Sequence, residues 1–348
     1  MALAVVACEI PFDLDQEASP KLYAQCIVDD GIVLLTPHYA TAVNASVSAA
    51  GQLSGLQLGV LVNGQAREML LHQAHGYYFS VGERLKAGDQ VELTLEADGV
   101  EPVKGTTQVP PAPQILEWSA RSVQVDTIQA TELRFLLDHA PLEGEFYGIR
   151  IAVHSAITRL DGTVDELDTY LTPGYILTAA QSGQFDLEDF LQVNYDGTTL
   201  GGSSYQPITL LTQKQFDGAE YRFYLDSYDA TMLDSIRERM PDGETGVAGG
   251  GIVSGDVGPG STSGGDPPDP GKIPVAIRLE YHFTLSRLSP AFYYYARALF
   301  QSNFDFLSNM GLTPANFTYS NLSGGLGVVG ALSSSTVGPL EVVKEIVK

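Results

Sequence analysis

Hydrophobic and polar residues alternate along residues 20–109 with the two-residue period of strands that have one face in water. The clearest run is VELTLE at 91–96, in which Val and two Leu residues alternate with Glu and Thr. Asn63-Gly64 stands between two apolar runs, the strongest short signal for a β-hairpin. About seven short strands fit into this segment, which predicts an immunoglobulin-like or fibronectin-like β-sandwich.

The stretch VPPAPQ at 109–114 is rich in proline, so residues 110–114 predict a stiff linker. Strand patterns resume after it and predict a larger β-rich domain over 115–340. The overall fold class is therefore mostly β, with two β-sandwich-like domains and one or two short helices in the second. The expected strands of that domain lie at 130–140, 145–160, 206–213, 219–229, 273–288 and the end of 317–337, with a turn at Asp161-Gly162 and short helices at 185–192 and 230–240.

The clearest helix is predicted over 289–307, where Ser289 can cap the first turn and Pro290 suits its first position. Apolar residues such as Phe292, Ala296 and Leu299 recur at helical spacing. We interpret the aromatic residues of this helix as core packing in preference to a platform for a ligand.

Residues 241–272 form the most biased segment of the chain, with 11 glycines and 5 prolines among 32 residues. Such a segment cannot bury enough apolar surface to offset the entropy of ordering it. We therefore expect a flexible insertion that interrupts the second domain, because the strand pattern resumes at 273.

The chain has 348 residues, which suits two domains, and its formal net charge is −23. This charge argues against binding to nucleic-acid phosphates. An anionic membrane surface would also repel the chain, so attachment to a membrane requires a covalent or inserted anchor. No apolar run reaches the length of about 18 residues that a spanning helix needs.

The sequence contains two cysteines, Cys8 and Cys26, too few for a disulfide framework. Cys26 stands in an apolar strand-like run and is interpreted as a buried core residue. Residues 5–8, Val-Val-Ala-Cys, resemble the bacterial lipobox, in which the cysteine thiol receives a diacylglycerol. Residues 1–19 are accordingly predicted to be a signal remnant, lipobox and acidic tether. No Lys or Arg precedes Lys21, so the leader lacks the usual basic start, and a buried N-terminal strand with a free thiol is the alternative.

Four segments, in this order and spacing, resemble a family of bacterial cell-envelope lipoproteins catalogued as domain of unknown function 4249. They are the lipobox, LKAGDQVELTL ahead of TQVPPAP, LEYHFTLSRLSPAFYYYARAL, and PANFTYSNLSGGLGVVGA. Asn321 and the pair Gly324-Gly325 match the family pattern near the end, whereas Val329 stands where an aromatic residue is common. The resemblance covers roughly residues 8–335.

The resemblance implies a lipoprotein of the outer membrane, facing the periplasm or the cell exterior, that is lipidated (palmitate among its acyl chains) at Cys8. It also implies that the protein is an accessory or binding partner of a TonB-dependent outer-membrane barrel. It implies no known ligand or activity.

A search for chemistry yields no catalytic residue, no cofactor and no metal site. There is no phosphate-binding loop and no G-x-S-x-G elbow. His72 and His75 are interpreted as structural or surface residues because they lie in a strand–turn region without zinc-helix spacing. The tripeptides at 126–128 and 234–236, Asp-Thr-Ile and Asp-Ser-Ile, match a bacterial O-glycosylation pattern and make Thr127 and Ser235 candidate glycan sites.

Three functions from different classes remain open. The first, which we prefer, is a non-enzymatic accessory of a TonB-dependent transporter. The second is a structural adhesin or pilus-type subunit, which would exchange an N-terminal strand with a neighbouring copy. The third and least favoured is a hydrolase, for which the second domain would have to supply an acid–base set. Ligand contacts in the first case are expected on loops at one end of the sandwiches or on the helix 289–307.

Overall fold

The structure is a computed structural model, and it describes residues 21–40, 54–73, 76–125, 128–170, 176–177, 192–195, 206–226, 274–304 and 319–345. The elements of the first third are β1 (Lys21–Asp29), β2 (Ile32–Ala40), β3 (Gln57–Val62), β4 (Gln65–Ala66), β5 (Met69–His72), β6 (Tyr77–Ser80), β7 (Gln90–Glu96) and β8 (Val103–Gln108). The middle of the chain forms β9 (Ile115–Val125), β10 (Ile128–Leu137), β11 (Phe146–Arg159), β12 (Val164–Tyr170), β13 (Ile176–Leu177), β14 (Gln192–Tyr195) and β15 (Gln206–Thr212). A short 3-10 helix η5 (Gln213–Gln215), then β16 (Phe216–Asp217), β17 (Glu220–Asp226), β18 (Pro274–Leu288), helix α2 (Pro290–Phe304) and β19 (Leu326–Glu345) complete the described part.

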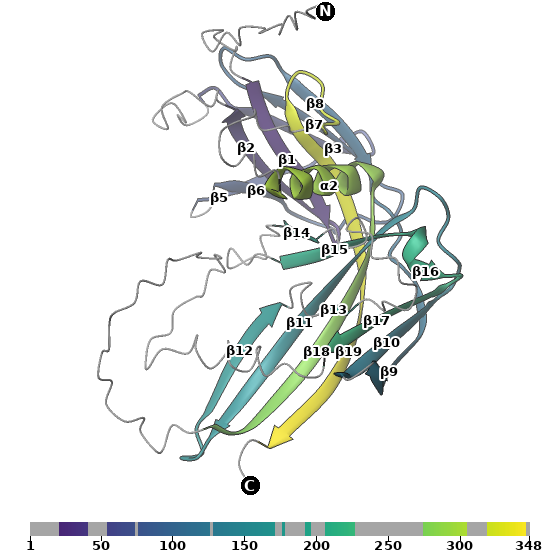
Figure 1. The fold of residues 1–348 in the computed structure, drawn as a ribbon. Helices are drawn as coiled ribbons and strands as arrows, with labels where there is room; N and C mark the ends of the chain where they lie inside the picture. Colours follow the sequence, from purple (N-terminus) through teal and green to yellow (C-terminus); the bar gives the residue numbers. More distant parts are fainter. Residues whose placement is uncertain are drawn as a thin grey trace, which may run out of the picture.

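The strands form three sheets (Figure 1). The largest has ten strands in the order β14-β15-β11-β18-β19-β1-β2-β6-β5, with β12 paired to β11. The second has the order β13-β17-β10-β9, with β16 paired to β17, and the third the order β4-β3-β7-β8. The fold is therefore mostly β and built from several packed sheets, as the sequence predicted.

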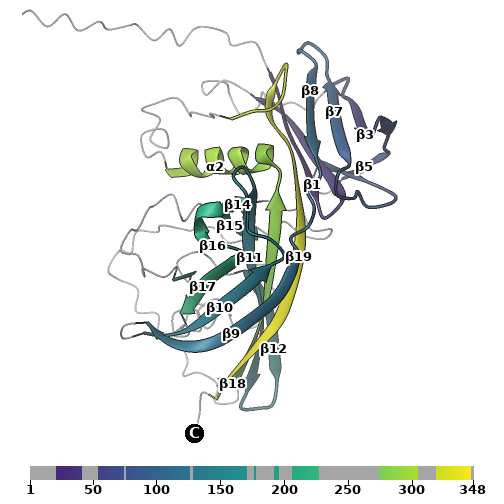
Figure 2. The same cartoon turned by 90° about the vertical axis from the view of Figure 1, so that its right-hand side faces the viewer.

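The 20-residue strand β19 links the two ends of the chain. It pairs in parallel with β1, so that Cys26 lies opposite Val329, and it pairs antiparallel with β18. In Figures 1 and 2 the yellow β19 runs the length of the molecule beside both early and late strands. The large sheet is thus continuous from β5 to β14.

The N-terminal core lies between the large sheet and the four-stranded sheet. The predicted alternation of β7 is confirmed, because its apolar residues are all buried here while Glu92 and Thr94 are only partly buried. Asn63 and Gly64 both have positive φ, as the predicted hairpin turn between β3 and β4 requires. Val329 and Ala331 of β19 also belong to this core. Residues 20–109 therefore do not complete their own core, and the division of the chain at 110–114 stays a prediction.

The second core lies between the long strands β11 and β18 and the sheet of β9, β10 and β17 (Figure 2). Its aromatic residues pack closely, with Phe135 and Phe223 stacked at 5.9 Å between ring centroids and Phe283 edge-on to both. The strand predicted at 273–288 is confirmed as β18, and its residues Ile277, Leu279 and Phe283 enter this core.

Helix α2 covers the opposite face of the large sheet. Phe292, Tyr293, Tyr295 and Ala296 are buried against apolar residues of β1, β11, β15, β18 and β19. Gly330 on β19 permits this approach, because a Cβ there would lie 2.9 Å from the Cβ of Phe292. The prediction that these aromatics form core is confirmed, and only Tyr294 is exposed among the three tyrosines.

Several predictions fall on residues that the structure does not describe: the N-terminal segment 1–19, the helices expected at 185–192 (except Gln192, which is described) and 230–240, and the insertion 241–272.

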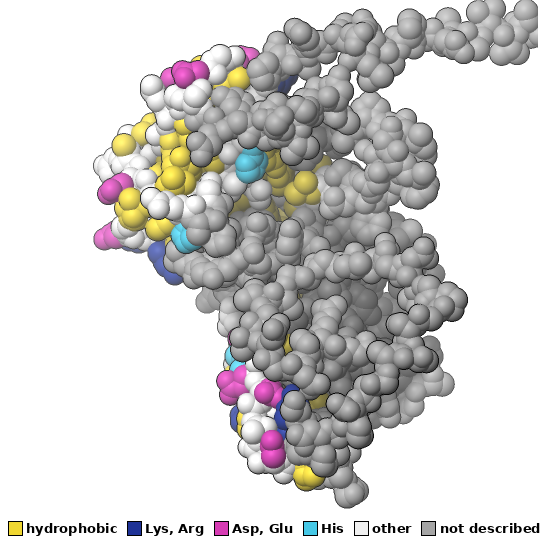
Figure 3. All heavy atoms as spheres, turned by 90° about the vertical axis from the view of Figure 1, so that its left-hand side faces the viewer, with side chains coloured by type: hydrophobic (Ala, Val, Ile, Leu, Met, Phe, Trp, Pro, Cys, Tyr) yellow, Lys and Arg dark blue, Asp and Glu magenta, His cyan; other side chains and the backbone are white. Residues whose placement is uncertain are grey.

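On the face shown in Figure 3, hydrophobic side chains gather in the upper half, and described acidic and basic side chains mix in the lower half. Leu70 and Leu71 of the edge strand β5 are both exposed.

Candidate functional site

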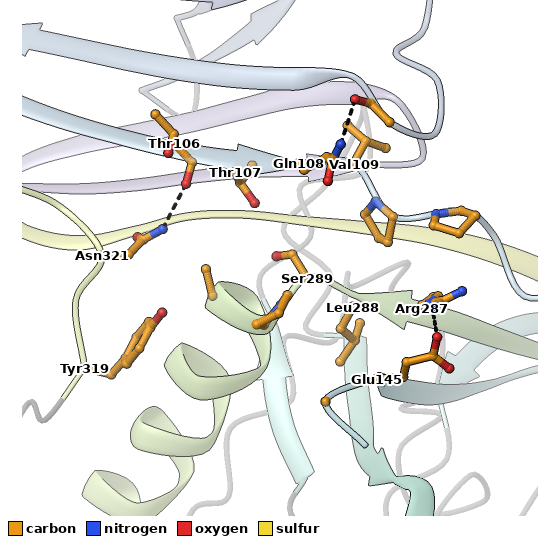
Figure 4. Close-up of a pocket in the computed structure, with 16 residues that line it drawn as sticks. Thr106, Thr107, Gln108, Val109, Glu145, Arg287, Leu288, Ser289, Tyr319 and Asn321 are labelled. Atoms are coloured by element: carbon orange, nitrogen blue, oxygen red, sulfur yellow. Dashed lines mark hydrogen bonds and ion pairs between the residues drawn. The ribbon is translucent and has the colours of Figure 1, made fainter. Parts of the chain in front are cut away.

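A cavity of about 650 Å³ opens where the four-stranded sheet approaches the start of α2 (Figure 4). This volume lies within the usual range of ligand pockets, about 300–1,000 Å³. One wall is the end of β8 with the proline stretch that follows it, residues 106–111. The opposite wall is the end of β18 and the first turn of α2, residues 287–291. Glu145 closes one end, and Tyr319 and Asn321 close the other.

Among the described strands, β8 is the edge of its sheet, and this edge forms the wall of the cavity. Lys104 exchanges two backbone hydrogen bonds with Ser323, at 3.0 and 2.8 Å, on the side of β8 away from β7. Because backbone groups alternate in direction along an antiparallel strand, those of Thr106 and Gln108 also point away from β7. The side chains of Thr106 and Gln108 are exposed, whereas Thr107 is buried.

Ser289 fixes the opposite wall. Its backbone N–H donates to the carbonyl of Ala331 at 2.8 Å, and its Oγ accepts from the N–H of Ala331 at 2.9 Å. The same Oγ accepts from the N–H of Phe292 at 3.3 Å, which caps α2 as the sequence predicted. Ser289 is therefore held by the backbone on both sides, and its hydroxyl oxygen already accepts two hydrogen bonds. This geometry is that of a structural residue and not of a nucleophile.

Asn321 joins the two sheets beside the cavity. Its Nδ2 donates to the carbonyls of Thr106 at 3.2 Å and Val329 at 2.9 Å, and its Oδ1 accepts from the N–H of Val329 at 2.9 Å. A single amide side chain thus pairs with both backbone groups of Val329 on β19 and also bonds to the edge of β8. Figure 4 shows it at the edge of β8, next to Tyr319.

An ion pair stands at the other end of the cavity, where Arg287 on β18 contacts Glu145. Glu145 also accepts from the N–H of Leu142 at 3.0 Å and from the hydroxyl of Tyr147 at 3.2 Å. Burial, with the charge of Glu145 as the next cause, raises the pKa of Tyr147 to about 12, so this phenol stays protonated at neutral pH. Glu145 is engaged by three donors, which gives it a structural role.

The glycines of the family pattern also have structural explanations. Gly324 has φ of +77°, and a Cβ there would lie 2.0 Å from the carbonyl oxygen of Pro102. At Gly325 a Cβ would lie 2.4 Å from a methyl of Val103. The segment therefore passes tightly between β8 and β1 before it enters β19. The residues that match the family pattern therefore connect β8 and β1 to β19, and the cavity lies beside this connection.

The residues proposed as modification sites, Cys8, Thr127 and Ser235, all lie outside the described residues. Cys26 is fully buried, and its burial raises its pKa to about 12. His72 stacks on Tyr77 at 4.9 Å between ring centroids, while His75 is outside the described part. Within the described residues no three His, Cys, Asp or Glu side chains come together in a way that could hold a metal ion.

Sequence reasoning named Ser289 and Asn321 but missed the cavity between them. The only available signal was the alternation of VKGTTQ in β8, which has exposed residues at 104, 106 and 108. That pattern indicates a strand but does not reveal that one of its edges is unpaired. The arrangement offers backbone hydrogen-bonding groups beside an apolar helix turn, which suits binding.

Fold and site together define a mostly β protein of packed sheets with a cavity at a sheet junction. The chain belongs to the family described as domain of unknown function DUF4249, which it matches over residues 9–337. No curated protein matches it. No helix in the described part of the chain is both long enough and apolar enough to cross a membrane.

Two solved structures show distant similarity. One is the Yersinia pseudotuberculosis adhesin InvE, at 11% identity and a TM-score of 0.16, with 76% of this chain and 55% of the adhesin covered. The other is labelled BspA_C_WT, at 10% identity and a TM-score of 0.14, with 77% of this chain and 96% of that chain covered. The chain thus spans about half the length of the adhesin.

Proposed function

We propose that this protein is a non-enzymatic lipoprotein of the outer membrane that acts as an accessory or binding partner of a TonB-dependent transporter. The observation that carries the proposal is the cavity between β8 and α2. Ser289 and Asn321 are engaged in structural hydrogen bonds there, and the backbone groups that face the cavity are those of a strand edge. A strand edge of this kind supports a role in binding a partner.

The attachment to the membrane is proposed to pass through a lipid on Cys8. The net charge of −23 supports a covalent anchor, because a chain of this charge is not held to an anionic membrane by electrostatics. The N-terminal unit is proposed to be an immunoglobulin-like sandwich, supported by its two packed sheets around one core.

The test is an affinity purification of the native full-length protein from detergent-solubilised outer membranes, with the partners identified by mass spectrometry. We expect a stoichiometric TonB-dependent barrel. The matched control is the chain with Cys8→Ser, which removes the proposed lipid and should leave the protein in the soluble fraction. Recovery of the protein without a barrel would reject the transporter role.

A structural subunit is the second candidate, and the exposed edge strand β5 favours it. Leu70 and Leu71 are 42% and 48% exposed on β5, the last described strand at this end of the large sheet. Exposed apolar edges promote strand pairing between chains. The same purification separates the two candidates, because a ladder of copies of this chain would support the subunit and no barrel would then accompany it.

Glycosylation at Thr127 and Ser235 is proposed from the tripeptides alone. Peptides that contain these residues, prepared from the native protein, should carry glycan masses. Unmodified peptides at both positions would reject the proposal.

A further inference from the structure

The edge of β8 is an unfinished ladder of backbone hydrogen bonds. Ser323 pairs with Lys104 in an antiparallel bridge, and the chain leaves the edge after that single pair. The next outward-facing carbonyl, that of Thr106, is taken by the side chain of Asn321 at 3.2 Å. The register then places the N–H of Thr106 and both backbone groups of Gln108 toward the cavity.

The edge also has a defined end. Val109 turns back toward the sheet, where its N–H donates to Asp89 and its carbonyl accepts from Gly88, at 2.9 Å each. Pro110 and Pro111 follow and have no N–H to offer. The free part of the edge therefore spans only residues 106–108, about 10 Å of extended chain.

The opposite wall is suited to side chains. Pro290 is exposed and Ala291 is half-buried, so both present apolar surface, and the ring of Tyr319 lies beside the first turn of α2 (Figure 4). A strand laid on β8 directs every second side chain toward one face, so alternate residues would meet this wall. Backbone pairing on one side and shallow apolar contact on the other are the two components of recognition by strand addition.

We propose that this groove binds a short extended peptide segment of a partner protein, which pairs antiparallel with residues 106–108 of β8. The inference rests on the proposed role as a binding partner and names the chemistry of the contact. The segment has free backbone N–H groups and apolar residues at every second position. A segment with proline at a pairing position, or with a run of acidic residues facing this chain of net charge −23, would be rejected.

The test uses the full chain with Cys8→Ser, a random dodecapeptide library displayed on phage, and calorimetry on synthetic copies of the selected peptides. We expect selected peptides to bind the parent chain and to lose about tenfold or more in affinity with Thr106→Pro. That change removes one outward N–H and leaves the bonds to β7 in place. The matched control Thr106→Val keeps the N–H and should bind within about twofold of the parent.

A second measurement does not depend on the folding of the proline variant. Selected peptides are resynthesised with N-methyl groups at every second residue, in either of the two registers. One register should abolish binding and the other should leave it intact, and hydrogen exchange of the Thr106 and Gln108 amides should slow when the unmodified peptide is added.

Three outcomes would overturn the proposal: no peptide selected, equal affinity for the parent and Thr106→Pro chains, or equal effects of both N-methyl registers. Slow exchange of the two amides in the free chain would also overturn it, because the edge would then be paired already. No membrane or transporter is used. A negative purification with positive peptide binding therefore rejects only the transporter, and the reverse result rejects only the groove.

Discussion

Replacing Asn321 with Ala should strongly destabilise the junction of β8 and β19. The side chain of Asn321 is bonded to both backbone groups of Val329, at 2.9 Å each, and to the carbonyl of Thr106 at 3.2 Å. Val329 is fully buried, so its N–H and C=O would lose their partners inside the core. Strand β18 does not take over, because its pairing with β19 begins at Leu332.

The magnitude follows from the two groups that are left unsatisfied. Each buried backbone group without a partner costs about 1–3 kcal/mol. The carbonyl of Thr106 faces the cavity and can be hydrated, so it adds little. Asn321→Ala should therefore lower the free energy of unfolding by about 2–4 kcal/mol.

The assay is urea unfolding followed by far-ultraviolet circular dichroism, with the midpoint and slope compared between variants. Ser323→Ala is the matched control, because it removes only an exposed bond from Oγ to the carbonyl of Lys104 at 3.2 Å and keeps the backbone bridge. It should cost less than about 0.5 kcal/mol. Equal midpoints for the two variants would refute the reasoning.

Asn321→Asp tests the direction in which the stability of a variant changes with pH. The carboxylate keeps an acceptor for the N–H of Val329 but faces the carbonyl oxygens of Val329 and Thr106, to which Nδ2 now donates. These oxygens disfavour the charged form and raise the pKa of the new group in the folded state. The variant should therefore be least stable at neutral pH and should recover stability as the pH falls toward about 4.

The remaining predictions concern other parts of the chain. With Cys8→Ser, Cys26 is the only thiol, and because burial raises its pKa to about 12, a maleimide at pH 8 should label it only in urea; rapid labelling of the native chain would contradict this. The hydrogen bond from Arg121 to Glu132, at 2.6 Å, is the main cause that lowers the pKa of Glu132, with a further bond from Tyr224 at 3.0 Å. The stabilisation from the charged Glu132 is present above the unfolded pKa of about 4.3 and is lost as the pH falls. Glu132→Gln should therefore lower the free energy of unfolding by about 1 kcal/mol at pH 7, a value discounted because Arg121 is exposed. The difference in stability between the parent and this variant should disappear in acid. A gap that stays constant between neutral and acid pH would exclude this linkage. Deletion of residues 241–272 should leave the thermal melt nearly unchanged, as expected for a flexible insertion, and a large drop would show that the segment packs.

Local patterns in the sequence were sufficient for most of the elements. The alternation in β7 and β18, the Asn63-Gly64 turn and the cap at Ser289 depend on interactions within a few residues, and each is found in the structure. Such features can be predicted from the sequence because strand and helix periodicities and turn conformations are set by the backbone itself.

The pairing of β1 with β19 was not predictable in this way. About three hundred residues separate Cys26 from Val329, and nothing in either strand specifies the other as its neighbour. Only when β19 occupies that place is the N-terminal core completed and the large sheet made continuous. The sequence predicted two sandwich-like domains, and the structure adds that residues of β19 pack in both cores.

The candidate site also depends on long-range packing. The hydroxyl of Ser289, the amide of Asn321 and the edge of β8 come from three distant segments, and they enclose a cavity only after the sheets have packed. Asn321 was recognisable as part of a family pattern, but its role as the partner of Val329 depends on where β18 stops. Local periodicity determines which residues form strands, and long-range packing determines which strand edges remain open for a partner.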